Sequence, residues 1–146
     1  MALKTYDPRK HDIIFAGILI NEGLADGTFL TISSDTPGFS VKVGVDGEAT
    51  RTRSHSKVAE AKVTLMQTSE VNDRLSALYA ADRAAVNGQG VGVFYVQDRA
   101  GTTVLQASKA FISDDPDVEL SDEASTREWT FILTDYAPIH GGNPDE

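Results

Sequence analysis

The stretch from Lys62 to Asp82, KVTLMQTSEVNDRLSALYAAD, changes its hydrophobic period halfway along. Val63 and Leu65 alternate with polar residues, which is the two-residue repeat of a β-strand. Apolar side chains then recur at the spacing of one helical face, at Val71, Leu75, Leu78 and Tyr79. The sequence therefore predicts a strand followed by one α-helix over about residues 69–83.

Ser69 stands where the period changes and is the predicted N-cap of this helix. Its hydroxyl can accept a hydrogen bond from an amide of the first turn, and Glu70 and Asp73 suit the positive end of the helix dipole. Asn87 and Gly88 close the segment. The rest of the chain has the pattern of strands and turns, so we expect a mainly β fold, a β-sandwich or barrel, with one helix.

Composition excludes several classes of protein. The 146 residues fit a single domain over residues 1–146, with a polar arm at residues 1–10 and a mobile tail at residues 140–146. No cysteine is present, so disulfides and thiolate metal sites are impossible. No apolar run approaches a membrane span, and the start of the chain lacks the apolar core of a signal peptide. The net charge of −9 disfavours conventional DNA binding.

Several other stretches are predicted strands. Residues 12–20, DIIFAGILI, are apolar on both alternating faces, which is typical of one strand that is buried on both sides. Residues 91–97 and 102–113 form a predicted hairpin, and residues 126–135 form the last strand. We expect the helix to pack on a sheet through four core residues: Leu75, Leu78, Trp129 and Phe131.

Residues 37–56 form a long predicted β-hairpin, here called the ribbon. Asp46-Gly47 separates two alternating runs and is typical of a two-residue turn with positive φ. Such a turn fixes the pairs across the ribbon: Val45 with Glu48, Val43 with Thr50 and Val41 with Thr52. One face would then carry valine and threonine, and the other would gather Lys42, Arg51 and Arg53. An isolated ribbon is marginal in water, so we expect it to project and dock on something.

The sequence contains no convincing catalytic, metal or cofactor site. His11, His55 and His140 lie far apart, and no short metal-binding spacing is present. No phosphate loop, dinucleotide fingerprint or nucleophile elbow occurs. Gly88, Gly90 and Gly92 follow a helix and precede a strand, which is the wrong order for a phosphate site. We therefore expect a protein without enzymatic activity and without a cofactor.

Charge is segregated along the chain. Residues 36–62 hold five basic side chains against three acidic ones, whereas residues 114–128 hold seven acids against Arg127. The acidic segment, with Asp114, Asp115, Asp117 and Glu119, does not have the spacing of a calcium-binding loop. If the two regions lie at opposite ends, the molecule could make head-to-tail contacts, which build rings or filaments. The alternative is that both regions are merely solvated surface.

The chain also resembles the tail tube proteins of contractile-tailed bacteriophages, almost from end to end. The resemblance is carried by six stretches in order: KTYDPRK at 4–10, ADGTF at 25–29, VGVDGEATRTRS at 43–54, VTLMQTSEVNDRLSAL at 63–78, DRAGTT at 98–103 and STREWTFIL at 125–133. No single one would suffice, but their order and spacing make the match specific.

The resemblance implies a structural role. It predicts hexameric rings that stack into a hollow tube inside a contractile sheath, through which phage DNA is ejected. The implied partners are further copies of the chain, the sheath, baseplate and tail terminator proteins, and DNA passing without sequence-specific binding. The implied location is the virion tail, assembled in the host bacterial cytoplasm, with no small-molecule substrate.

The resemblance also suggests roles for the two charged regions. A long loop of the family reaches the adjacent hexameric ring, which would make the ribbon the contact between rings, through Lys42, Val43, Val45, Asp46, Gly47, Arg51 and Arg53. Asp114, Asp115, Asp117 and Glu119 are then candidates either for its acidic partner or for the lumen, which we expect to be lined by net negative charge.

Two other functions remain open from the sequence. The chain could form the tube of a phage-derived contractile injection particle or secretion system, which gene neighbourhood would distinguish from a phage. It could instead be a monomeric β-sandwich that binds a small ligand or carbohydrate. Sugar sites usually expose aromatic residues, however, and the one tryptophan, Trp129, lies on a predicted core face.

Overall fold

A computed structural model describes residues 3–88 and 90–143 of the chain, and it confirms a mainly β fold. Within these residues there is one α-helix, α1 (Val71–Ala84), and a short 3₁₀ turn, η1 (Pro8–Lys10). The strands are β1 (His11–Phe15), β2 (Ile18–Leu19), β3 (Leu30–Ser34), β4 (Phe39–Val43), β5 (Ala49–Arg53), β6 (Ala59–Met66), β7 (Gly92–Asp98), β8 (Val104–Asp114), β9 (Thr126–Leu133) and β10 (Tyr136–Ile139).

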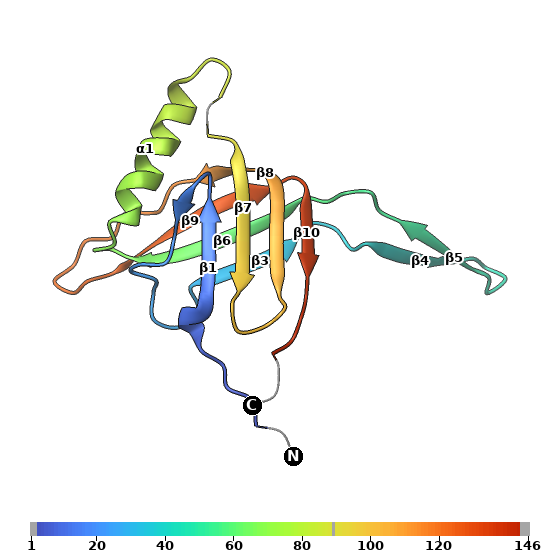
Figure 1. Cartoon of the computed structure of the whole chain (residues 1–146). Coiled ribbons are helices and arrows are strands. Elements are labelled where there is room, and N and C mark those ends of the chain that lie inside the picture. The colour runs from blue at the N-terminus through green and yellow to red at the C-terminus, as the bar shows by residue number, and fades with distance from the viewer. Residues whose placement is uncertain (1–2, 89, 144–146) are drawn as a thin grey trace.

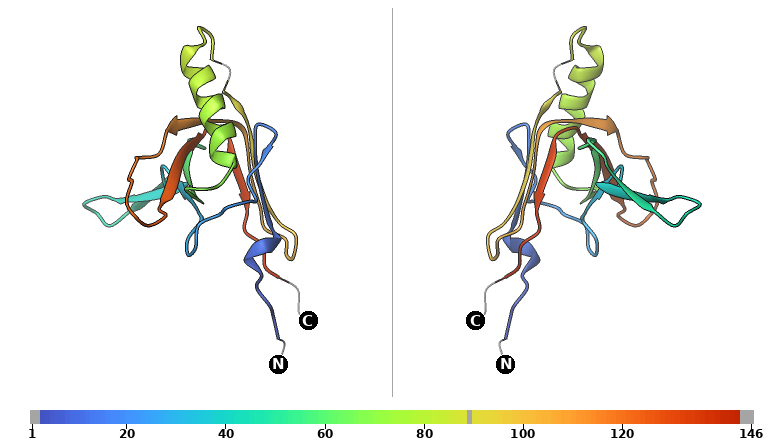
Figure 2. Two further views of the ribbon diagram at one scale, coloured as in Figure 1. Left: turned by 90° about the vertical axis from the view of Figure 1, so that its left-hand side faces the viewer. Right: turned by 90° about the vertical axis from the view of Figure 1, so that its right-hand side faces the viewer.

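Eight strands form one large antiparallel sheet that folds over into two layers (Figures 1 and 2). Its order is β2-β1-β7-β8-β9-β6-β3, with β10 also paired to β8, and it does not close into a barrel. The sheet bends at β8, whose first half pairs with β7 and β10 while its second half pairs with β9. The two layers enclose the core, as in a sandwich.

Three phenylalanines from different strands meet at the centre of this core. The ring centroid of Phe131 lies 4.9 Å from that of Phe15 and 5.3 Å from that of Phe94. All three side chains are buried, as are Trp129 and Leu75. Alternating inward positions on β6 and β9 supply seven of the seventeen buried apolar residues of the core. The two-residue period seen in the sequence thus builds the packed layer between the sheets.

Residues 12–20 form a tight hairpin rather than the single strand predicted from their apolar faces. Ala16 and Gly17 both have positive φ, at 50° and 84°, and form the two-residue turn that pairs Phe15 with Ile18. Both residues of such a turn need positive φ, which glycine adopts readily and alanine seldom. The apolar run therefore divides into β1, whose Ile13 and Phe15 enter the core, and the short edge strand β2.

The helix begins as predicted near Ser69, but its buried residues, Val71 and Leu75, both lie in its first half. The Val71 N–H donates to Ser69 Oγ at 3.3 Å, so the serine hydroxyl caps the first turn. Trp129 Nε1 donates to Asn72 Oδ1 at 2.9 Å and joins the helix to β9. The later turns extend beyond the sheet (Figure 1), which leaves Leu78 only half-buried. The full burial expected for Leu78 is therefore wrong.

We expect Leu78→Ala to lower the free energy of unfolding by about 1 kcal/mol, below the range of about 2–5 kcal/mol for a fully buried leucine. The matched variant Leu75→Ala, at a completely buried position of the same helix, should fall within that higher range. Urea unfolding followed by circular dichroism measures both. Equal losses in the two variants would contradict the partial packing of the helix.

The two ends of the chain are attached to the same turn between β7 and β8. Arg99 donates from its backbone N–H to the Lys10 carbonyl at 2.8 Å, and its Nη2 donates to the Arg9 carbonyl at 2.9 Å. On the other side, Thr102 and Thr103 exchange hydrogen bonds with Gly141 and Gly142. Of the tail predicted to be mobile, residues 144–146 lie outside the described residues. Both arms run to the same end of the molecule (Figure 1).

Candidate assembly surfaces

The ribbon projects from the body of the molecule, as predicted (Figure 1). Strands β4 and β5 form a two-stranded sheet of their own, and every residue from 39 to 53 is exposed. The ribbon continues from the pair β3–β6, because the Asp35 N–H donates to the Val58 carbonyl at 3.0 Å and the Ser54 N–H donates to the Gly38 carbonyl at 2.9 Å. It is thus the outer part of one long hairpin anchored in the second layer.

The pairing within the ribbon differs by one residue from the predicted one. The Gly47 N–H donates to the Gly44 carbonyl at 3.0 Å, and the Gly44 N–H donates to the Glu48 carbonyl at 2.8 Å. Gly47 has a φ of 88°, which gives a three-residue loop closed by a glycine bulge instead of the two-residue Asp46-Gly47 turn. Val41 therefore lies opposite Arg51, and Val43 lies opposite Ala49.

This shift corrects the predicted faces of the ribbon, because a slip of one residue moves each side chain to the other side. Two arginines share a face with the apolar residues, here called the mixed face: Phe39, Val41, Val43, Arg51 and Arg53. Lys42 lies on the opposite face with Ser40, Thr50 and Thr52. The predicted separation into a valine-threonine face and a cationic face is therefore wrong.

The mixed face is held in shape by stacking of arginine on phenylalanine. The guanidinium carbon of Arg51 lies 3.7 Å from the centroid of the Phe39 ring, and that of Arg53 lies at 5.6 Å. Phe39, Val41 and Val43 are 48%, 67% and 62% exposed, so the stack and the valines form an open apolar strip. Within the part of the chain that the structure describes, neither arginine forms an ion pair. Both arginines are exposed.

The acidic segment forms a groove at the start of β9. The groove has a volume of about 450 Å³ and is lined by Asp114, Asp115, Asp117, Glu119, Thr126, Glu128 and Thr130. Glu128 joins the four acids singled out in the sequence because β8 pairs with β9: Asp114 lies opposite Thr130, two residues from Glu128 along β9. The nearby Arg127 is turned elsewhere, since its Nη1 donates to Ser125 Oγ at 3.2 Å and to the Thr126 carbonyl at 3.3 Å.

Hydrogen bonds hold the acidic segment against the body. Ser125 Oγ lies 2.9 Å from Gln67 Oε1 and 3.1 Å from the Glu119 carbonyl oxygen. The same segment exposes Val118 and Leu120, which are each 74% accessible. Acids and apolar side chains therefore occur together here, as cations and apolar side chains do on the ribbon. In Figure 1 the ribbon extends to the right and the acidic segment lies to the left, at opposite ends of the molecule.

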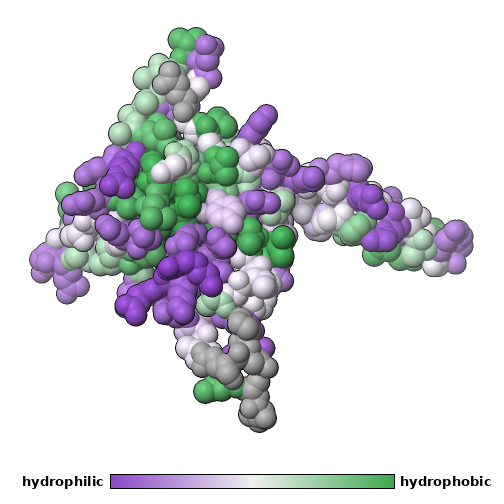
Figure 3. Space-filling model, in the orientation of Figure 1, coloured by the Kyte–Doolittle hydropathy of each residue, from purple (hydrophilic) through white to green (hydrophobic). Residues whose placement is uncertain are grey.

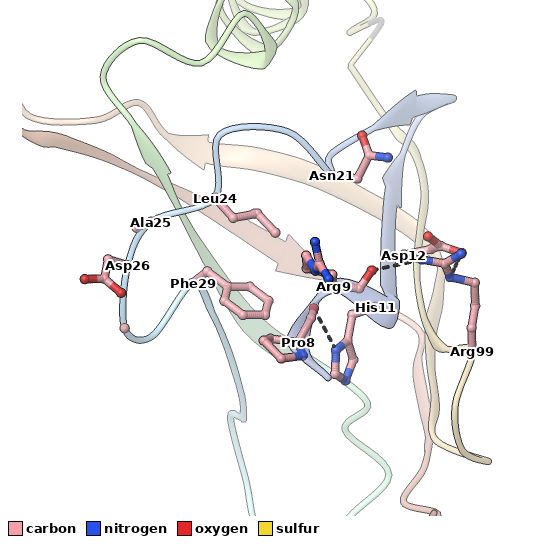
Figure 4. Close-up of a pocket in the computed structure, with 11 residues that line it drawn as sticks. Pro8, Arg9, His11, Asp12, Asn21, Leu24, Ala25, Asp26, Phe29 and Arg99 are labelled. Carbon is pink, nitrogen blue, oxygen red and sulfur yellow. Dashed lines mark hydrogen bonds and ion pairs between the residues drawn. The ribbon is translucent and has the colours of Figure 1, made fainter. Parts of the chain in front are cut away.

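A third hollow, which the sequence did not indicate, lies beside the N-terminal arm (Figure 4). Its volume is about 370 Å³, and its walls come from η1, β1, the 21–29 segment and Arg99. Three of its polar side chains have partners: Arg99 Nε lies 3.3 Å from Asp12 Oδ2, and His11 Nδ1 lies 3.3 Å from the Pro8 carbonyl oxygen.

The described residues also bear on metal binding, on the ionisation of Tyr136 and on membrane spans. Among residues 3–88 and 90–143, no three His, Asp or Glu side chains converge in a way that could hold a metal ion. Burial raises the pKa of the Tyr136 phenol above its ordinary value of 10.0, so this group stays protonated at neutral pH. In the part described, no helix is long and apolar enough to span a membrane.

Comparison with known proteins points to phage tails. The family model described as the bacteriophage PhiTE tail tube protein matches residues 19–141. A relative from Pseudomonas phage KPP10, described as structural protein ORF10, is 31% identical over 121 residues, which is 83% of this chain and 70% of that protein.

Two solved structures share the fold. The cap that terminates the tube of the anti-feeding prophage has a TM-score of 0.59 at 9% identity, covering 95% of this chain and 94% of the cap. The sheath/tube terminator of PVC, an extracellular contractile injection system, has a TM-score of 0.58 at 13% identity, covering 94% of this chain and 99% of the terminator. At such low identity these similarities concern the fold alone.

Proposed function

Because the chain belongs to the bacteriophage PhiTE tail tube protein family, we propose that it is a structural protein whose copies form hexameric rings that stack into a tail tube. The tube lies inside a contractile sheath and serves as the conduit for phage DNA. The match over residues 19–141 carries this proposal, since it includes the helix, the ribbon and every strand from β3 to β10.

The exposed ribbon supports a subunit that is completed by its neighbours. A ribbon that forms a two-stranded sheet of its own is marginal as an isolated structure in water. Its exposed apolar strip is of the kind that usually marks a contact surface. We propose that it bridges one hexameric ring to the next, with Lys42, Val43, Val45, Asp46, Gly47, Arg51 and Arg53 as contact residues.

The charge of the chain suits a DNA conduit. A net charge of −9 disfavours trapping of a passing duplex, because carboxylates repel backbone phosphates. We propose that net negative charge lines the lumen. The remaining partners in this proposal are the sheath, baseplate and tail terminator proteins of the virion tail, assembled in the host cytoplasm. The chain itself would have no substrate and no catalytic role.

A phage-derived injection particle would use a tube protein of the same design. The two terminator proteins with the same fold come from an anti-feeding prophage and from an extracellular contractile injection system. Genes for capsid and terminase beside the gene of this chain would favour a phage, and their absence would favour the injection particle.

Size measurement and negative-stain electron microscopy of the purified chain test the tube proposal. We expect discrete rings or long hollow rods at high protein concentration, because ring and tube contacts are weak singly and strengthened by repetition. A folded chain that stays monomeric at high concentration, alone and with the tail proteins of the same phage, would contradict the proposal and favour the ligand-binding alternative.

A further inference from the structure

We propose that the mixed face of the ribbon on one copy docks into the acidic groove of a second copy. This inference rests on the proposed tube function and names the surface that receives the ribbon. The occupant of the groove is thus the strip formed by Arg51, Arg53, Val41 and Val43.

The mixed face is built to bind carboxylates. Stacking on Phe39 occupies the flat side of the Arg51 guanidinium and leaves its N–H edges free. Those edges match the two oxygens of a carboxylate, which arginine can bind through two parallel hydrogen bonds. Had the arginines been on the opposite face, as first predicted, ionic and apolar contacts would have needed two partners. Because the arginines and the apolar residues share one face, a single partner can make both kinds of contact.

The groove has the complementary composition. Five carboxylates line it, and no basic side chain does. Like charges gathered in one hollow repel each other, and a cationic partner relieves that repulsion. Val118 and Leu120 do not line the groove, but they alternate with its acids along the same segment and are exposed, so valines of the ribbon can cover them. Figure 3 shows apolar and charged residues side by side along the projecting ribbon.

The positions of the two surfaces require a second copy. The ribbon and the acidic segment lie at opposite ends of the molecule, so one chain cannot join them (Figure 1). A contact between two different patches on identical chains is head-to-tail and leaves one of each patch free for the next copy. Repetition along the assembly follows directly from this arrangement.

Cysteine cross-linking tests the contact without requiring tube growth, since the chain has no cysteine of its own. One population carries Val41→Cys on the mixed face and the other carries Thr126→Cys in the groove. In the control, the chain with Thr126→Cys is mixed with a chain that carries Val86→Cys instead of Val41→Cys. Val86 is a fully exposed valine beyond the helix. After mixing and mild oxidation, we expect the Val41→Cys pair to cross-link at least about tenfold faster than the Val86→Cys pair, as for a specific contact.

Charge exchange provides the second readout. Adding R51E and R53E to the Val41→Cys chain should lower cross-linking by at least about tenfold, because like charges then face each other. Adding D115R and D117R to the Thr126→Cys chain should restore it. K10E, at an exposed position of the N-terminal arm outside both surfaces, is the control for a change of charge alone. Circular dichroism checks that each variant is folded.

Equal cross-linking by the Val41→Cys and Val86→Cys pairs, or no rescue by the exchanged charges, would overturn this inference. If duplex DNA abolished the cross-linking and the exchanged charges did not restore it, the arginines would be assigned to nucleic-acid binding instead. Wild-type rods seen by microscopy together with failed rescue would leave the tube function standing and place the acceptor elsewhere. A chain that is always monomeric would remove the tube function itself.

Discussion

Replacing Phe131 with alanine is expected to lower the free energy of unfolding by about 3–5 kcal/mol, the range for loss of a buried phenylalanine. Phe131 is completely buried and lies within 5.3 Å, centroid to centroid, of both Phe15 and Phe94. Its removal leaves a cavity between the two layers of the sheet, where backbone on both sides resists collapse. Urea unfolding followed by the fluorescence of Trp129, the single tryptophan, measures the loss.

Phe39→Ala is the matched control, because the same side chain is removed from the exposed ribbon. Its effect on the free energy of unfolding should stay within about 0.5–1 kcal/mol, from loss of the stack with Arg51. It should weaken assembly instead, since the mixed face loses its platform. A large loss of stability in Phe39→Ala, or a small one in Phe131→Ala, would contradict the described division between core and ribbon.

Removing the ribbon is expected to abolish tube formation while leaving the body folded. Residues 39–53 can be replaced by an Asn-Gly turn, because Gly38 and Ser54 are already joined by a backbone hydrogen bond of 2.9 Å. The deleted residues are all exposed and form a separate two-stranded sheet, so the free energy of unfolding should change by less than about 1 kcal/mol. Negative-stain microscopy under conditions where the wild type forms rods measures the loss of assembly.

The paired substitution T50A/T52A, on the face opposite the arginines, keeps the ribbon and serves as its control. We expect this variant to assemble like the wild type. Normal rods from the chain that lacks residues 39–53 would show that the ribbon is not needed between hexameric rings. Rods lost from both variants would show that both faces of the ribbon are contact surfaces.

The sequence was sufficient to predict the helix and the position of the ribbon, but not the pairing within it. Asp46-Gly47 is compatible with a two-residue turn and with a three-residue loop, and only the bonds of Gly44 distinguish the two. One residue of difference moved Arg51 and Arg53 from a separate cationic face to the side of Val41. The sequence was enough to identify the charged residues of the ribbon, whereas the residues beside them depended on how its two strands pair.

Packing between distant segments was the other limit. Leu75 and Leu78 lie on the same predicted face of the helix. Nevertheless, α1 extends past the sheet, and of these two residues only Leu75 is fully buried. Glu128 likewise joins the acidic groove only because β8 pairs with β9. The hollow beside the N-terminal arm draws on segments up to ninety residues apart, such as Arg9 and Arg99. Local period cannot report such long-range arrangements.

The attachment of both chain ends to the β7–β8 turn has a practical consequence. Arg99 holds the N-terminal arm and Thr102 holds the C-terminal one, at an end of the molecule away from the ribbon and from the acidic groove (Figure 1). A peptide or small protein fused genetically to either terminus would leave both surfaces uncovered. In the proposed tube, the chain would then serve as a scaffold that displays cargo at regular intervals.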